Sequence, residues 1–174
     1  LGDGVALDSW DLLFDPEYMS KLAACGVSFL DSPSEVYPLA LFHLGKNPNS
    51  LDEADYTGVA NDLLMKIRPH IRKFSSSEYI NSLADGEICV AMGFSGDIGI
   101  AKARAEEAGN GVNIRYIIPK EGTEIWFDSL AIPADAPNPE SAHAFIDYML
   151  RPEVIAAVKR QLDEHGVAAA VSLG

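Results

Sequence analysis

Residues 87–97 read Glu87-Ile88-Cys89-Val90-Ala91-Met92-Gly93-Phe94-Ser95-Gly96-Asp97. The apolar run 87–92 predicts a buried strand, and residues 98–108 are predicted to form a helix. Residues 94–97 therefore lie at a strand-to-helix corner, where α/β proteins place groups that face a ligand. A carboxylate beside an aromatic ring suits an alkylammonium ligand, because the charge meets an anion while the ring takes the cation and its methylenes. The corner predicts an α/β protein with a polyamine site.

A second pairing of a ring with a carboxylate follows in the extended run 124–132. In an alternating strand Trp126, Asp128 and Leu130 share a face, and a carboxylate on that face needs a partner or a cleft. Each candidate also has an ordinary structural interpretation. Asp97 could simply complement a helix dipole, and the aromatic side chains could be core residues.

Helices and strands alternate along most of the chain. Pro16 fits the first turn of one helix, and Asn138 fits the cap of another. The Ala-Pro-rich link 132–137 suggests that the last two helices pack elsewhere than on the first sheet. Helices are predicted at residues 16–24, 35–44, 55–68, 75–84, 98–108, 138–150 and 152–164, and strands at 27–30, 71–74, 87–92, 112–118 and 124–132. Glu35 begins the helix that follows a strand, which places it in a cleft.

Composition limits the class of partner. The chain has 26 acidic and 13 basic residues and a formal charge of -13. This charge repels phosphate backbones and anionic lipids, so a nucleic-acid partner is not expected, although acidity alone also serves solubility. No apolar run approaches the ~20 residues that span a bilayer, and residues 1–4 lack the features of a signal peptide. We expect a soluble chain with any export signal outside it.

Cysteine and histidine positions give no metal or redox motif. Cys25 and Cys89 are 64 positions apart, a spacing that excludes a CxxC motif and a zinc site. They could pair in an oxidising compartment or remain two buried thiols. The four histidines show no ligand spacing: His43, His70, His143 and His165. No metal and no cofactor is expected.

Several separate motifs resemble the periplasmic polyamine-binding proteins of ABC transporters, over about residues 8–158. The motifs are the runs Asp8-Ser9-Trp10-Asp11-Leu12-Leu13-Phe14, Cys25-Gly26-Val27-Ser28-Phe29-Leu30-Asp31, Tyr79-Ile80-Asn81, Ile88-Cys89-Val90-Ala91-Met92-Gly93 and Arg151-Pro152-Glu153-Val154. The resemblance implies a two-lobed type II periplasmic binding protein that closes around putrescine, spermidine or related amines. It further implies a periplasmic location, a membrane permease as partner, and a disulfide between Cys25 and Cys89.

The resemblance covers the second lobe and the return into the first, so the chain is expected to be partial, with a mixed sheet flanked by helices. Residues 8–123 would form the second-lobe α/β domain, and residues 124–137 a hinge-crossing strand and link. Residues 138–174 would be helices that return towards the absent first lobe. The tail 159–174 departs from the family, and a ligand-wall tyrosine expected there is missing.

Ligand-binding positions follow residue by residue from the resemblance. Glu35, Asp97 and Asp128 match carboxylates that hold ammonium groups, and Trp126 matches an aromatic platform like that of spermidine-preferring members. Phe94 stands where many members have Trp, which keeps a ring but removes an indole donor. One alternative is a serine hydrolase, because residues 93–96 approach the G-x-S-x-G elbow, with His143 or His165 as base. Another is an acidic protein-interaction module, for which an exposed apolar patch would be the sign.

Overall fold

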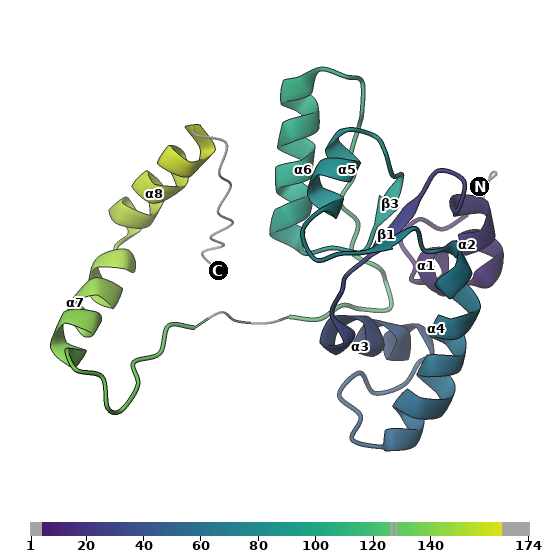
Figure 1. Cartoon of the computed structure of the whole chain (residues 1–174), viewed down its shortest axis with the longest axis horizontal. Helices are drawn as coiled ribbons and strands as arrows, with labels where there is room; N and C mark the ends of the chain where they lie inside the picture. The colour runs from purple at the N-terminus through teal and green to yellow at the C-terminus, as the bar shows by residue number, and fades with distance from the viewer. Residues whose placement is uncertain (1–4, 126, 128, 165–174) are drawn as a thin grey trace. The chain divides into compact units, whose positions relative to one another are not determined.

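The computed structural model describes residues 5–125, 127 and 129–164. The chain divides into two compact units, one up to Glu124 and one from Ile125 onward (Figure 1). The first unit contains α1 (Asp11–Phe14), α2 (Pro16–Leu22), β1 (Val27–Phe29), α3 (Pro33–His43), the π-helix η1 (Asp55–Ala60), α4 (Asn61–Ile67), the 3-10 helix η2 (Arg68–His70), β2 (Lys73–Phe74), α5 (Tyr79–Ala84), β3 (Val90–Ala91) and α6 (Ser95–Ala108). The second unit contains α7 (Pro139–Met149) and α8 (Pro152–Glu164).

The sheet has the order β2-β1-β3, and both pairings are parallel. Ser28 lies opposite Lys73 in one pairing and opposite Ala91 in the other. All three residues of the central strand β1 are buried, as expected for a parallel sheet covered on both faces. Figure 1 shows α5 and α6 on one side of the β1 and β3 pair and α1 and α2 on the other.

The sheet is smaller than predicted, and among the described residues it is parallel, not mixed. Residues 112–118, expected as a strand, form no ladder, and the described residues of 124–132 lie in no strand. A cavity of about 540 Å³ is lined by residues of both segments, 88–93 and 112–119, among others. Sequence alternation indicates an extended backbone, but a strand also needs a neighbour within hydrogen-bonding reach.

The core of the first unit forms where α1, α2 and α3 meet the sheet. Its largest fully buried side chains are Tyr79, Phe14, Phe29, Met19, Leu41, Ile67 and Val27. The Phe14 and Phe29 rings meet edge to face, with centroids 6.0 Å apart. Such a pair adds about 0.5–1.5 kcal/mol to the free energy gained by burying the rings.

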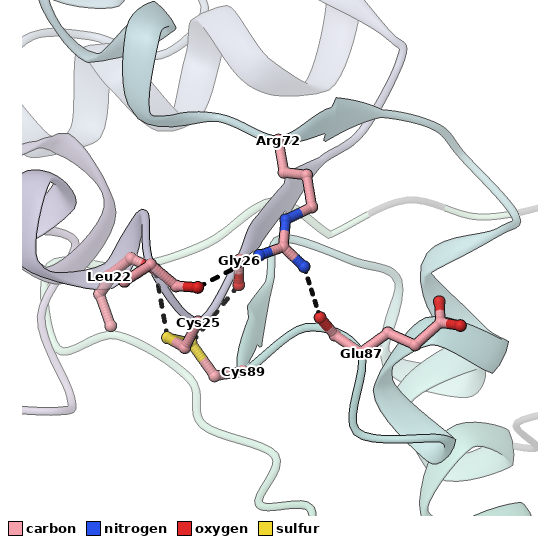
Figure 2. Close-up of a disulfide and its surroundings, with 7 residues drawn as sticks. Leu22, Cys25, Gly26, Arg72, Glu87 and Cys89 are labelled. Carbon is pink, nitrogen blue, oxygen red and sulfur yellow. Dashed lines mark hydrogen bonds between the residues drawn. A yellow bond between two sulfur atoms is a disulfide. The ribbon is translucent and has the colours of Figure 1, made fainter.

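A disulfide and an arginine pin the end of α2 to the start of β3. Cys25 and Cys89 are bonded, with Cα atoms 5.5 Å apart, so the pairing implied by the family resemblance is present (Figure 2). Gly26, which directly follows Cys25, has φ of 97°, a value that favours glycine. A Cβ at this position would collide with the Arg72 guanidinium. Arg72 donates to the Glu87 carbonyl at 2.6 Å and to the Ala24 carbonyl at 3.3 Å. The disulfide and the hydrogen bonds of Arg72 therefore both join the segment after α2 to the segment before β3.

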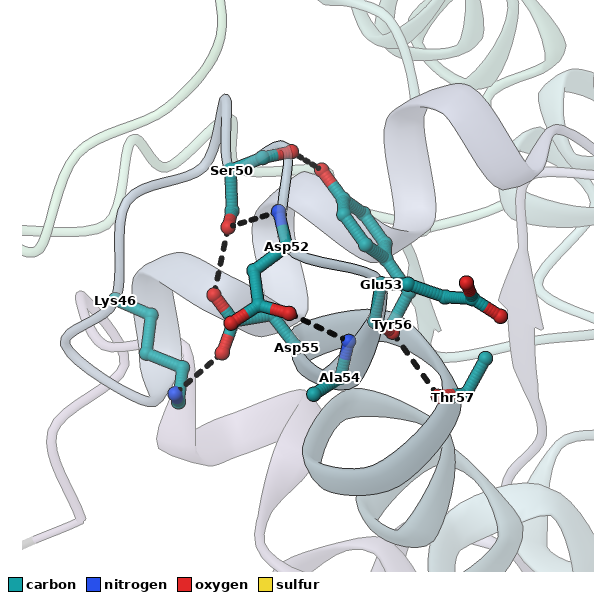
Figure 3. A network of polar contacts seen from close by, with 8 residues as sticks. All are labelled: Lys46, Ser50, Asp52, Glu53, Ala54, Asp55, Tyr56 and Thr57. Atoms are coloured by element: carbon teal, nitrogen blue, oxygen red, sulfur yellow. Dashed lines mark hydrogen bonds and ion pairs between the residues drawn. The ribbon is translucent and has the colours of Figure 1, made fainter.

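A polar network holds the loop between α3 and η1 (Figure 3). Asp55 pairs with Lys46 at 2.5 Å and accepts the Ser50 hydroxyl at 2.7 Å. These bonds from Lys46 and Ser50 lower the pKa of the Asp55 carboxyl. The Tyr56 hydroxyl donates to the Ser50 carbonyl at 2.6 Å. These side-chain bonds add to the backbone hydrogen bonds of the loop, such as the one from the Ser50 N–H to the Asn47 carbonyl at 3.1 Å.

Candidate functional site

The predicted strand-to-helix corner is present at the junction of β3 and α6. Phe94 is the N-cap residue of α6, with an extended backbone of φ -73° and ψ 144°. Asp97 lies in the first turn of the helix, where the helix dipole favours a carboxylate. Both side chains are half-buried. The helix starts at Ser95, three residues before its predicted start, so Asp97 belongs to the helix itself.

Tyr79, the first residue of α5, joins the corner across the sheet edge. Its hydroxyl donates to Asp97 Oδ2 at 2.6 Å and accepts the Phe94 backbone N–H at 3.0 Å. Burial, followed by the hydrogen bond to Asp97, raises the pKa of the Tyr79 phenol, so it remains a donor at neutral pH. In the sequence this tyrosine was noticed only as part of a family motif, with no role in the site.

Glu35 lies near the start of another helix, α3, which follows strand β1 of the same sheet. It lies in the first turn of α3 and is half-buried, and its Oε2 accepts the Ser34 hydroxyl at 2.9 Å. The loop before α3 is tied to the loop before α5, because the Asp31 backbone N–H donates to Ser76 Oγ at 3.1 Å. Since the strands are parallel, the N-termini of α3, α5 and α6 follow the same edge of the sheet.

Glu124 is a carboxylate that the sequence analysis missed. Burial, followed by the nearby negative charge of Glu35, raises its pKa to about 7. Among the described residues no hydrogen bond or ion pair offsets this repulsion. The signal was available, because in an alternating run Glu124 shares a face with Trp126 and Asp128. A positive charge near Glu124 would favour its ionised form, because it would offset burial and the charge of Glu35.

The structure brings the predicted residues together in part. Phe94 and Asp97 form one corner, and the charge of Glu35 acts on Glu124. Trp126 and Asp128 lie outside the described residues, so their place in the site stays a prediction. The cavity beside β3 is not the amine site, because its lining contains no carboxylate and its one charged side chain is Arg115.

Neither a metal site nor a membrane span is found in the part of the chain that the structure describes. No group of three or more His, Cys, Asp or Glu side chains there could hold an ion. Of the helices described, none is both long enough and apolar enough to cross a bilayer.

Comparison with known proteins identifies the family. The model of the bacterial extracellular solute-binding protein family matches residues 8–171. The chain belongs to this family. The resemblance to periplasmic polyamine-binding proteins and the lobe-like α/β fold are thereby confirmed, and the serine hydrolase alternative is not supported. Ser95 is an exposed residue at the start of α6.

Relatives within the family are named for polyamine binding. The chain is 55% identical over 158 residues to the putrescine-binding periplasmic protein PotF of Escherichia coli, covering 91% of this chain and 43% of that protein. It is 52% identical to the putrescine-binding periplasmic protein SpuD of Pseudomonas aeruginosa, covering 90% of this chain and 42% of that protein. The solved spermidine/putrescine ABC transporter substrate-binding protein PotD of Streptococcus pneumoniae aligns with TM-score 0.63 and 31% identity, covering 86% and 43%. The chain therefore spans less than half the length of these relatives.

Proposed function

We propose that this chain is part of the solute-binding component of an ABC polyamine importer and forms one wall of a site that captures putrescine or spermidine between two lobes. The observation that carries the proposal is the 55% identity to a protein named for putrescine binding. Residues 8–123 would form the second lobe, residues 124–137 a hinge-crossing strand and link, and residues 138–174 helices that return towards the first lobe. A membrane permease would receive the ligand, and the periplasm would be the compartment.

The chemistry of the wall supports an amine ligand. Asp97 and Glu35 would hold ammonium groups, and Phe94 would cover the methylenes between them. Glu124 adds a carboxylate whose ionisation an ammonium group would favour, because the cation offsets the repulsion from Glu35. Asp128 and Trp126 would complete the wall as a third carboxylate and a platform. The formal charge of -13 would attract cationic solutes to this surface.

Enclosure between lobes would give the site its affinity. An ammonium group held by an open half-site stays in water, where an ion pair contributes only about 0–1 kcal/mol. The chain alone is therefore expected to bind polyamines weakly or not at all. Once a first lobe covers the site, each carboxylate is paired with an ammonium group away from water. Removing that carboxylate would leave the ammonium charge buried without a partner.

The test uses a two-lobed protein that joins this chain to the remaining part of the E. coli relative. Calorimetric titration should show that the unsubstituted protein binds putrescine and spermidine. Asp97→Ala or Asp128→Ala should weaken the binding free energy by several kcal/mol. Trp126→Ala should cost roughly 1–2 kcal/mol, the value of a partly desolvated cation-π contact.

Asp62→Ala is the matched control, because Asp62 also lies in the first turn of a helix but is exposed. It should leave both affinities unchanged. Equal spermidine binding with Asp97 and Asp128 both replaced would refute the site, and no binding by the unsubstituted protein would refute the function.

A further inference from the structure

Tyr79 occupies an unusual position for a polar side chain. It is 1% exposed, yet its hydroxyl lies between the Asp97 carboxylate and the Phe94 backbone N–H. A buried hydroxyl needs partners, and both of the partners here belong to the β3–α6 corner. The same hydroxyl therefore links α5 to a carboxylate and to the backbone that carries an aromatic ring.

The direction of each bond follows from the donors available. The Phe94 N–H can only donate, so the phenolic oxygen accepts there and its single proton is left for Asp97. The 2.6 Å distance to Asp97 Oδ2 is typical of a hydroxyl that donates to a charged carboxylate. No second hydrogen bond to the Asp97 carboxylate is found in the described part of the chain. One carboxylate oxygen of Asp97 is thus held by the phenol.

The backbone around the corner is adapted to this ring. A Cβ at Gly93 would collide with the edge of the Tyr79 ring, at Cε2, Cζ and the hydroxyl oxygen. Glycine at this position lets the phenol approach the corner closely enough to reach both partners. The position of the buried Tyr79 ring therefore depends on a glycine at residue 93.

We infer that Tyr79 is a positioning residue for polyamine binding: its hydroxyl orients the Asp97 carboxylate towards the ammonium group. The inference rests on the proposed function, because it acts through Asp97 as an amine ligand. A carboxylate that is already oriented loses less side-chain entropy when ligand binds, which favours affinity without a direct contact.

The test is a double-mutant cycle in the two-lobed protein, with putrescine as the ligand. Tyr79→Phe removes only the hydroxyl and should weaken binding about tenfold, a change of about 1.4 kcal/mol. In an Asp97→Asn background the same substitution should change affinity less than about twofold, because the group through which it acts is already neutral. A merely structural role would give the same loss in both backgrounds.

Tyr56→Phe is the matched control, since Tyr56 also donates a 2.6 Å hydrogen bond but to the Ser50 carbonyl. It should leave putrescine affinity unchanged. Urea unfolding of each variant checks the fold. If Tyr79→Phe fails to unfold cooperatively, Gly93→Ala, which keeps the hydroxyl but displaces the ring, should show the same dependence on Asp97.

The outcomes separate the inference from the proposed function. Tenfold weaker binding that disappears in the Asp97→Asn background supports the inference. Unchanged binding by Tyr79→Phe, or an equal loss in both backgrounds, overturns it while the proposed function stands. Absence of putrescine and spermidine binding by the unsubstituted protein overturns both.

Discussion

The two units differ in how they use apolar residues. In the unit up to Glu124, side chains such as Phe14 and Phe29 are fully buried against a sheet. In the unit from Ile125 onward, α7 contains no buried residue, and Phe145 is 59% exposed. A helix gains most of its stability by packing an apolar face against another surface. The first unit supplies that surface itself, whereas α7 of the second unit contributes none of the fully buried side chains.

The largest expected effect distinguishes the two units directly. Phe14→Ala should lower the free energy of unfolding by about 3–5 kcal/mol, because it leaves a cavity in a packed core. Phe145→Ala should change it by less than about 0.5 kcal/mol, since the ring is largely exposed. Urea unfolding followed by circular dichroism measures both. A similar loss from the two substitutions would show that the second unit is packed as tightly as the first.

Removal of the disulfide should destabilise the first unit alone, because both cysteines lie in it. Replacing Cys25 and Cys89 by alanine frees a loop of 64 residues, and the chain-entropy model gives a loss of about 4 kcal/mol. Fluorescence of the buried Trp10 in urea would report the shift. Adding a thiol reductant to the alanine variant is the control and should change nothing further. An unchanged midpoint would mean that the pairing of β1 and β3 needs no covalent link.

Helix caps offer a smaller contrast of the same kind. The Asp15 side chain accepts the Glu17 N–H at 2.7 Å at the start of α2, whereas Asn138 makes no side-chain cap bond at the start of α7. Asp15→Ala should therefore cost about 1 kcal/mol of unfolding free energy, while Asn138→Ala should cost clearly less. Chemical denaturation of the two variants, side by side, decides the point. Equal losses would contradict the contrast.

The smallest expected effect lies at the boundary of the two units and depends on pH. The pKa of Glu124 is raised to about 7, so this group stabilises the folded state below its unfolded pKa, and that contribution is lost as pH rises towards 7. The melting temperature of Glu124→Gln, taken relative to that of the unsubstituted chain, should therefore be higher at pH 8 than at pH 4. Thermal unfolding at a series of pH values measures the difference.

Glu121 provides the comparison of opposite sign. Burial raises its pKa, but hydrogen bonds, first from the Ser9 hydroxyl and then from backbone N–H groups that include that of Trp10, outweigh burial and hold the pKa below its usual value. Its contribution is present above the unfolded pKa and is lost as pH falls. Glu121→Gln should thus be destabilising at neutral pH and less so in acid. The same pH trend for both glutamine variants would contradict the assignment.

Much of the fold could be predicted from local patterns. The Pro16 start of α2 and the stop before Gly26 are local signals, and each was confirmed within two residues. The capping box at 75–78 is present in part, because Ser75 Oγ accepts the Glu78 N–H at 3.0 Å. The helix it introduces begins at Tyr79. Where a rule depends on neighbours along the chain, the prediction succeeds.

Strand predictions failed where a distant partner was needed. The run 112–118 alternates apolar and other residues, yet it lines the cavity beside β3 and pairs with no described strand. Strands 27–30 and 87–92 were predicted correctly in place but shortened to the residues that pair. Extended backbone is a local property, whereas hydrogen bonding between strands is not.

The sequence by itself determined the α/β class, the corner with Phe94 and Asp97, and the position of Glu35 after a strand, because strand, turn and helix signals act between near neighbours. Only the tertiary structure decided that Tyr79 holds Asp97 across 18 residues and that Glu124 feels the charge of Glu35. Hydrogen bonds and charge repulsion act through space, so they depend on which segments the folded sheet brings to one edge.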